Sequence, residues 1–260
     1  MFLRKCSFLK DSYNKIVSIT LPNKDLIVIS NELKYLVRNP RKSLIGRSLY
    51  RKGVWEPELT STVLSLVKPG MTIVDVGADI GYFTLLFAKC AGEGGQVFSF
   101  EPIPKAREYL ERNIALNGFK NIRIESCALF DSERNIILEQ PFNKSRVNPK
   151  KKIASSHDIR VITRIFDQWV EKRNIARIDA IKIDVEGAEL NVLKGMKKSI
   201  QKYHPHFFIE IHPEYIKQFG YKTAEVIAFL NDYKYRIEPV NMPKIDFSKE
   251  NCIVHCYKKQ

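Results

Sequence analysis

Four side chains in the second half of the chain could move a proton and hold a hydroxyl group: Asp184, Glu186, Glu210 and His212. Charged and apolar residues alternate over 180–186, so Asp184 and Glu186 point to the same face of the expected strand. Glu210 and His212 share a face of the next expected strand in the same way. Because the carboxyl ends of parallel strands meet at one edge of a sheet, we expect these four side chains to gather there.

This group of carboxylates and an imidazole suits a reaction in which a bound hydroxyl loses its proton. His212 is the expected general base, since an unperturbed histidine titrates nearest neutrality, and Asp184 or Glu186 would bind the acceptor hydroxyl. A purely structural network is the alternative. In that network Lys182 neutralises the carboxylates and His212 caps a turn before Pro213.

The sequence favours a site without a metal. Three oxygens and an imidazole in this group could also hold Mg²⁺, but no tight ligand spacing supports that alternative. A zinc site at Cys252, His255 and Cys256 is excluded by the geometry of the expected strand. There the two thiols share a face roughly 13 Å apart, and the imidazole points the other way.

A glycine turn follows the first expected strand of the larger domain. Gly77 allows a sharp turn off the strand, and Gly81 lets the next helix pack closely. The spacing is Gly-x-x-x-Gly, unlike the Gly-x-Gly-x-x-Gly of dinucleotide sites. Asp75 and Asp79 add negative charge where a pyrophosphate would be repelled, so a ligand with an amino group and few negative charges is favoured.

Glu101 ends the next expected strand, where folds of this kind place a carboxylate that accepts both ribose hydroxyls. An ordinary strand-end acid or helix cap is the alternative, which the upstream glycine turn makes weaker. A ribose diol, a methionine-like amine and no phosphates together describe S-adenosylmethionine.

The chain resembles the FkbM family of S-adenosylmethionine-dependent methyltransferases from about residue 52 to residue 240. Five stretches carry the resemblance: Trp55-Glu-Pro-Glu58, Val74-Asp-Val-Gly-Ala-Asp-Ile-Gly-Tyr-Phe-Thr84, Phe100-Glu-Pro102, Asn113-Ile-Ala-Leu-Asn117 and Lys182-Ile-Asp-Val-Glu-Gly-Ala-Glu189. One residue departs from the pattern: Asp79 stands where the family usually has asparagine.

The resemblance implies a class I methyltransferase fold and methylation of a hydroxyl or carboxyl oxygen on a small molecule, sugar or glycolipid. It also implies cofactor contacts in the glycine turn and at the ends of the following strands. The candidates for cofactor binding are Glu56, Asp75, Gly77, Ala78, Gly81, Tyr82, Phe83, Glu101, Pro102, Cys127, Ala128 and Asp184.

Strand and helix patterns alternate after residue 71, which predicts a doubly wound, Rossmann-like α/β sheet of seven mostly parallel strands. The last two strands follow each other without a long helix, so the last strand is expected to be antiparallel. The expected strands are 72–76, 96–100, 122–127, 180–184, 207–212, 235–240 and 252–257. The expected helices are 56–67, 82–90, 104–117, 166–172, 186–202 and 223–233.

We expect residues 53–260 to form the methyltransferase domain and residues 1–52 to form an N-terminal extension. A turn signal at 22–25 predicts a hairpin between 16–21 and 26–29, and a basic segment follows over 38–52. The stretch 140–158 has little to bury and is expected to be a loop or insertion, in which His157 is a weaker candidate for contact with the acceptor.

The composition favours a folded protein, since 44% of the residues are hydrophobic and 11% aromatic. Disordered, collagen-like and disulfide-scaffold proteins are excluded, and the odd set of five cysteines is typical of reduced thiols in a cytoplasmic protein. The net charge of +14 attracts polyanions. RNA methylation through the basic segments 38–52 and 144–152 is therefore the alternative function, and no transmembrane segment is expected.

Overall fold

The chain contains two units, residues 1–55 and residues 56–260, in a computed structural model that describes residues 21–139, 146–147, 158–240, 246 and 250–258. In the first unit, β1 (Leu26–Ser30) pairs antiparallel with β2 (Leu33–Val37), and α2 (Leu44–Lys52) follows. Asn31 and Glu32 form the two-residue turn with φ of 48° and 64°, the positive values that such a hairpin needs.

Residues 26–30 pair with 33–37, a hairpin that the sequence did not predict. Residues 16–20 of the expected hairpin between 16–21 and 26–29 lie outside the described part, so that pairing stays a prediction. Two arginines of the basic segment donate hydrogen bonds to backbone carbonyls of the first unit. Arg41 Nε donates to the carbonyl of Leu21 at 2.6 Å, and Arg47 Nη2 donates to the carbonyl of Arg41 at 3.0 Å. These two guanidinium groups therefore hold the chain that surrounds α2.

The second unit is built on a seven-stranded sheet in the order β12-β13-β11-β10-β3-β4-β5. All neighbouring strands are parallel except β13, which is antiparallel to β11 and β12. The strands are β3 (Thr72–Val76), β4 (Gln96–Phe100), β5 (Ile122–Glu125), β10 (Ala180–Ile183), β11 (His206–Ile211), β12 (Tyr235–Pro239) and β13 (Cys252–Lys258). This arrangement confirms the predicted sheet and its antiparallel last strand.

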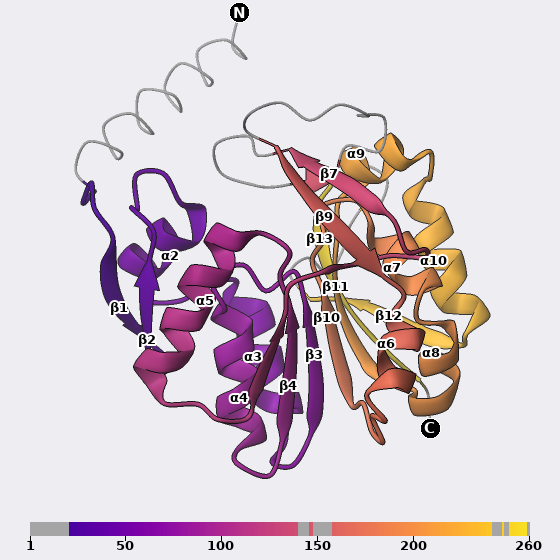
Figure 1. The fold of residues 1–260 in the computed structure, drawn as a ribbon, viewed down its shortest axis with the longest axis horizontal. Helices are drawn as coiled ribbons and strands as arrows, with labels where there is room; N and C mark the ends of the chain where they lie inside the picture. Colours follow the sequence, from indigo (N-terminus) through magenta and orange to yellow (C-terminus); the bar gives the residue numbers. More distant parts are fainter. Residues whose placement is uncertain (1–20, 140–145, 148–157, 241–245, 247–249, 259–260) are drawn as a thin grey trace, which may run out of the picture. The chain divides into compact units, whose positions relative to one another are not determined.

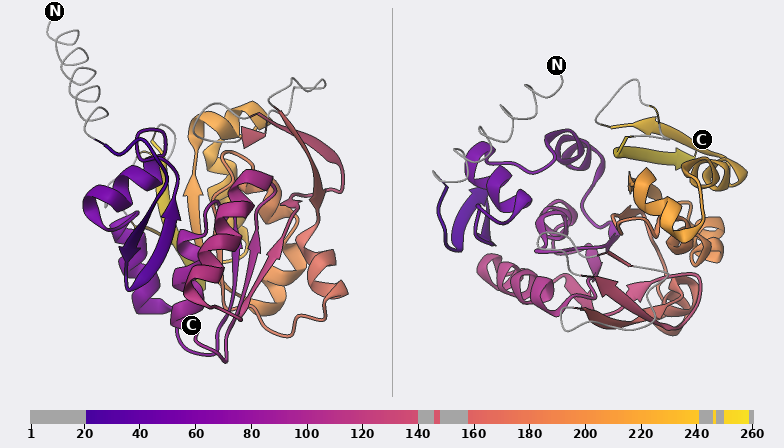
Figure 2. Two further views of the ribbon diagram at one scale, coloured as in Figure 1. Left: turned by 60° about the vertical axis from the view of Figure 1, so that its left-hand side comes forward. Right: turned by 90° about the horizontal axis from the view of Figure 1, so that it is seen from above.

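Helices cover both faces of this sheet, as Figure 1 and Figure 2 show. One face carries α3 (Pro57–Leu66), α4 (Tyr82–Ala91) and α5 (Pro104–Asn117). The other carries α6 (Phe166–Lys172), α7 (Glu189–Lys194), α8 (Lys197–Tyr203) and α10 (Thr223–Asp232). The short α9 (Pro213–Ile216) and η1 (Lys217–Phe219) follow β11. Within the described residues, no helix is long and apolar enough to cross a membrane.

The helix expected over 186–202 is two helices, α7 and α8. Glu186 and Gly187 have φ of 50° and 107°, so α7 begins only at Glu189. Between the two helices, a Cβ on Gly195 would lie 2.3 Å from the carbonyl oxygen of Phe130. The close approach of these two backbones requires glycine there.

A second, smaller sheet was not expected from the sequence. It joins β6 (Ala128–Leu129), β9 (Ile159–Arg164), β7 (Asn135–Glu139) and β8 (Arg146–Val147) in that order. The pairing of β7 with β9 is antiparallel and brings the two ends of the expected loop together. His157 and the lysines at 150–152 lie outside the described residues.

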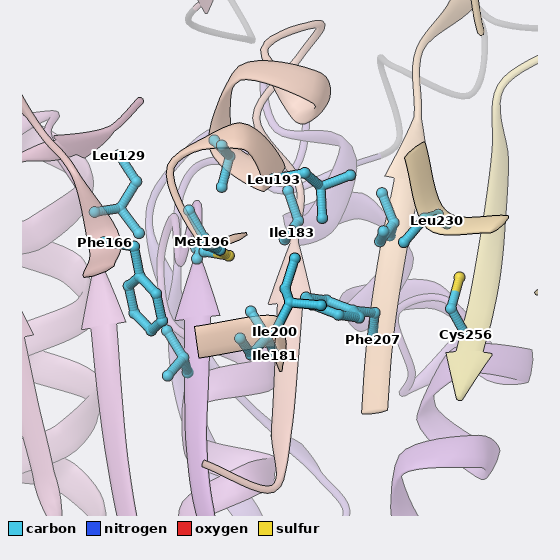
Figure 3. Packing of buried hydrophobic residues seen from close by; sticks show 14 of the residues in the cluster. Leu129, Phe166, Ile181, Ile183, Leu193, Met196, Ile200, Phe207, Leu230 and Cys256 are labelled. Atoms are coloured by element: carbon cyan, nitrogen blue, oxygen red, sulfur yellow. The ribbon is translucent and has the colours of Figure 1, made fainter. Parts of the chain in front are cut away.

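The two faces of the large sheet differ in polarity. Ile181, Ile183 and Phe207 point with Leu193 and other apolar side chains of α7, α8 and α10 into one core cluster (Figure 3). The opposite face carries Asp75, Ser99, Lys182 and Glu210 on neighbouring strands, and α4 lies against it. Thr84 of α4 donates to Asp75 at 2.6 Å and lies 3.0 Å from the hydroxyl of Ser99. The polar side chains of these central strands therefore lie on the α4 side of the sheet.

Candidate active site

The glycine turn follows β3 and packs against the end of β10, at the point where the strand order reverses. The amide of Asp184 donates to the carbonyl of Val76 at 3.0 Å. A Cβ on Gly77, whose φ is 85°, would lie 1.9 Å from the carbonyl oxygen of Asp184. Gly77 is thus required by the neighbouring backbone as well as by its positive φ. At Gly81, where φ is 90°, an added Cβ would meet the side chain of Leu110 at 2.4 Å.

Glu101 follows β4 and is 4% exposed. Its Oε2 accepts from the amide of Asp79 and its Oε1 from the amide of Ile103, both at 2.8 Å. Burial, followed by the negative charge of Asp79, raises the pKa of Glu101 to about 8. Two backbone donors therefore fix the carboxylate, and each of its oxygens can still accept a further hydrogen bond.

Asp79 occupies a left-handed conformation with φ of 46°. Asparagine and aspartate tolerate this region better than other side chains. Aspartate therefore suits the backbone at this position, where the family usually has asparagine. The difference between the two residues is the negative charge of Asp79, which raises the pKa of Glu101.

Asp75 and Lys182 form the buried floor of the α4 face, at 1% and 4% exposure. One oxygen of Asp75, Oδ2, accepts from Thr84, whereas Oδ1 makes no hydrogen bond within the described part of the chain. Burial raises the pKa of Asp75 although the Lys182 charge opposes this. Lys182 Nζ lies 3.3 Å from Oδ2 of Asp184 and 5.2 Å from the ring centroid of Phe83.

Lys182 remains an ammonium ion in this environment. Burial lowers its pKa, but the negative charges of Asp184, Asp75, Glu56 and Glu210 outweigh burial and raise it. The electrostatic coupling to Glu56 places that residue, which precedes α3, within range of the same face. Lys182 thus neutralises part of the carboxylate group, as the structural alternative requires.

His212 directly follows β11 and is 0% exposed. Its Nδ1 lies 2.9 Å from Oε1 of Glu189, a carboxylate that is also fully buried and accepts from the amide of Gly187 at 3.0 Å. Its Nε2 lies 3.2 Å from Oε1 of Glu210 and 3.5 Å from Oε2 of Glu186. The expected group of carboxylates therefore forms around this imidazole.

The expectation that His212 titrates near neutrality is wrong. Burial disfavours the charged imidazole, but Glu189, Glu210 and Asp184 outweigh burial and raise the pKa of His212 to about 11. A histidine that keeps its proton at neutral pH is not poised to act as a general base. That Asp184 or Glu186 binds the acceptor hydroxyl stays a prediction.

Glu189 is the residue that the sequence reasoning missed. The sequence places it only at the end of the motif 182–189, yet it is the buried partner of His212. The sequence did contain a signal for its role: three acidic residues, Asp184, Glu186 and Glu189, follow one another closely after β10. A turn with positive φ at 186 and 187 directs the third carboxylate back towards β11.

The remaining candidates lie at three places. Tyr82, Ala78 and Phe83 are buried in or next to the glycine turn, and the Tyr82 hydroxyl lies 3.1 Å from Oγ1 of Thr60. Pro102 follows Glu101. Two candidates lie beyond β5: Cys127 packs against the large core cluster and Ala128 against the smaller one. Their contact with a cofactor stays a prediction.

Known proteins share both the sequence pattern and the fold. "Methyltransferase 1" of Beauveria bassiana is 28% identical over 144 residues, and the match spans 48% of this chain and 57% of that protein. "Hexuronic acid methyltransferase AglP" of Haloferax volcanii is 27% identical over 183 residues, and the match spans 70% of this chain and 71% of that protein. The chain thus covers little more than half the length of the fungal relative.

A solved structure of methyltransferase FkbM from Methylobacillus flagellatus has a TM-score of 0.51 to this chain, with 18% identity, over 74% of this chain and 45% of that one. At this identity the likeness shows the fold, a class I methyltransferase sheet. The family model of the methyltransferase FkbM domain matches residues 75–237, more than half of the sequence. The glycine turn, Glu101 and the carboxylates around His212 all lie inside this span, and the chain belongs to the FkbM methyltransferase family.

Proposed function

We propose that this protein transfers a methyl group from S-adenosylmethionine to an oxygen atom of a sugar or another small molecule. The buried carboxylate of Glu101, fixed by two backbone amides beside the glycine turn, carries the proposal. Its remaining acceptor positions suit a pair of ribose hydroxyls. When bound, the cofactor supplies a methyl group on a sulfonium; the acceptor oxygen gains that methyl and loses its proton.

Other features of the site fit the same cofactor. The buried Oδ1 of Asp75 has no hydrogen-bond partner in the described residues, so it can accept from an ammonium group. Gly77 and Gly81 keep side chains out of the turn between Asp75 and α4. Asp75, Asp79 and Glu101 would repel a pyrophosphate, which argues against a dinucleotide.

The sugar acceptor is supported by the relative from Haloferax volcanii, whose name specifies a hexuronic acid. The carboxylates of Asp184, Glu186 and Glu210 would bind and orient acceptor hydroxyls at the ends of β10 and β11. RNA is the less supported acceptor. Arg41 and Arg47 of the basic segment already donate to backbone carbonyls, which leaves fewer of their N–H donors for phosphates.

Calorimetric titration with S-adenosylhomocysteine tests the cofactor first. We expect one-to-one binding that is lost in Glu101→Ala and weakened in Glu101→Gln. The control Glu93→Gln removes the same charge from an exposed loop before β4, at the opposite end of the strand. A folded wild-type protein that binds no S-adenosylhomocysteine would contradict the proposal.

Transfer of labelled methyl from S-adenosylmethionine to uronic acids and neutral sugars then tests the acceptor. Base-stable label on a sugar identifies an ether, and base-labile label identifies an ester of a carboxyl group. Label found only in added RNA would favour the alternative function.

A further inference from the structure

The ends of β10 and β11 bring three potential metal ligands together. Asp184, Glu210 and His212 each offer one ligand atom, and these atoms lie within 4.8 Å of one another. Ligand atoms around a metal at about 2.1 Å are separated by roughly 3 Å in neighbouring positions and by about 4.2 Å in opposite positions. Side-chain shifts of less than about 1 Å would therefore bring all three ligand atoms onto one cation and leave its other coordination positions open.

The imidazole of His212 is held as a metal-binding histidine is held. Its Nδ1 is fixed at 2.9 Å by the buried carboxylate of Glu189. Its Nε2 is fully buried, faces Glu210 at 3.2 Å and makes no hydrogen bond within the described residues. A carboxylate on one ring nitrogen and a metal on the other is the usual arrangement around protein-bound cations.

We propose that Asp184, Glu210 and His212 bind one divalent cation. Lys182 donates to Oδ2 of Asp184, and a carboxylate has about four lone-pair sites on its two oxygens, so it can accept a hydrogen bond and bind a cation together. Two carboxylates with one imidazole suit cations that accept both oxygen and nitrogen, and Mn²⁺ is the member of this class most easily followed. As at any histidine ligand, the proton on Nε2 leaves when the metal binds. The sequence had favoured a site without a metal because these ligands come from two strands and have no tight spacing.

The position of the cation indicates its use, and this step rests on the proposed function. Asp184 is bonded through its backbone to β3 beside the glycine turn, so the metal would lie between the cofactor residues and the acceptor. A cation there would bind two neighbouring oxygens of a sugar, such as a vicinal diol or a hydroxy acid. It would also lower the pKa of a bound hydroxyl.

Electron paramagnetic resonance of Mn²⁺ titrated into the chelator-treated full chain tests the site without cofactor or acceptor. We expect loss of the free-ion signal with about one Mn²⁺ per chain, reversed by excess Mg²⁺. Asp184→Asn and Glu210→Gln keep the side-chain shapes and should each weaken binding at least tenfold. Glu214→Gln removes a charge from an exposed residue paired with Lys217 and should leave binding unchanged.

Circular dichroism establishes that each variant is folded before its affinity is compared. The proposal is overturned if the folded wild type leaves Mn²⁺ free at 100 µM protein and metal, or if both ligand variants bind it as the wild type does. If the protein binds S-adenosylhomocysteine but not Mn²⁺, the cation site is refuted and the proposed function stands. If it binds Mn²⁺ but not S-adenosylhomocysteine, the cation site stands and the assigned cofactor is refuted.

Discussion

Replacing Asp79 by asparagine should strengthen cofactor binding at neutral pH. Burial and the charge of Asp79 raise the pKa of Glu101 to about 8, so at pH 7 only about one carboxylate in ten is ionised. If the ionised form accepts the ribose hydroxyls, wild-type affinity for S-adenosylhomocysteine rises about tenfold between pH 7 and pH 9. Asp79→Asn removes one cause and leaves burial, so affinity at pH 7 should improve by about two- to tenfold.

The assay is calorimetric titration with S-adenosylhomocysteine at pH 6, 7, 8 and 9. The wild type should show a strong dependence on pH and Asp79→Asn a weaker one, while Glu93→Gln should follow the wild type. Equal wild-type affinities at pH 7 and pH 9 would refute the assigned role of Glu101. Parallel curves for the wild type and Asp79→Asn would refute the role of the Asp79 charge.

The same pKa shift has a consequence for stability. A carboxyl whose pKa is raised from 4.5 to about 8 on folding stays protonated while the unfolded chain ionises, so the free energy of unfolding falls as pH rises from about 4.5 to about 8. Asp79→Asn should recover part of this loss. Its melting temperature should exceed that of the wild type at pH 8.5, and the difference should shrink towards pH 5.

Three further substitutions compare the packing of the site with that of the apolar core by chemical denaturation. Gly77→Ala places a methyl group on the carbonyl oxygen of Asp184 and should cost more than about 2 kcal/mol and abolish cofactor binding. Thr84→Val removes the donor to the buried Asp75 and should cost about 1–3 kcal/mol, which Thr84→Ser should largely restore. Leu193→Ala in the fully buried core should cost about 2–5 kcal/mol and leave cofactor affinity unchanged. The reverse pattern, with binding lost only in Leu193→Ala, would contradict the placement of the site on the α4 face.

The large sheet was predictable because its strands carry a two-residue period. In β10, Ile181 and Ile183 enter the core while Lys182 faces α4, as the alternation requires. The hairpin of the first unit was not predicted, because the turn at Asn31 and Glu32 has no glycine to mark it. In the smaller sheet, Ile159–Arg164 alternates well, but its partner strand lies beyond a long polar stretch.

The electrostatics of the site could not be predicted, because they depend on distances between segments far apart in the sequence. His212 was chosen for its ordinary pKa, and its partner Glu189 comes from the preceding crossover helix. Folding brings the two into a fully buried pair, where a hydrogen bond and nearby carboxylates outweigh the cost of burying the charge. The residue types could therefore be identified in advance, whereas the protonation of His212 required the structure.

The arrangement of charge on β10 supports a binding role for the whole α4 face. Burying a lysine such as Lys182 in a central strand costs several kcal/mol, and its bond to Asp184 only offsets that cost. Apolar side chains would serve stability better at these positions, as Ile181 and Ile183 do on the opposite face. This network contributes little to stability and ends at one edge of the sheet. It leaves Oδ1 of Asp75 and Nε2 of His212 without hydrogen bonds in the described residues. These properties suit the binding of a ligand. The cofactor would satisfy Oδ1 of Asp75, and a cation would bind Nε2 of His212 in place of its proton.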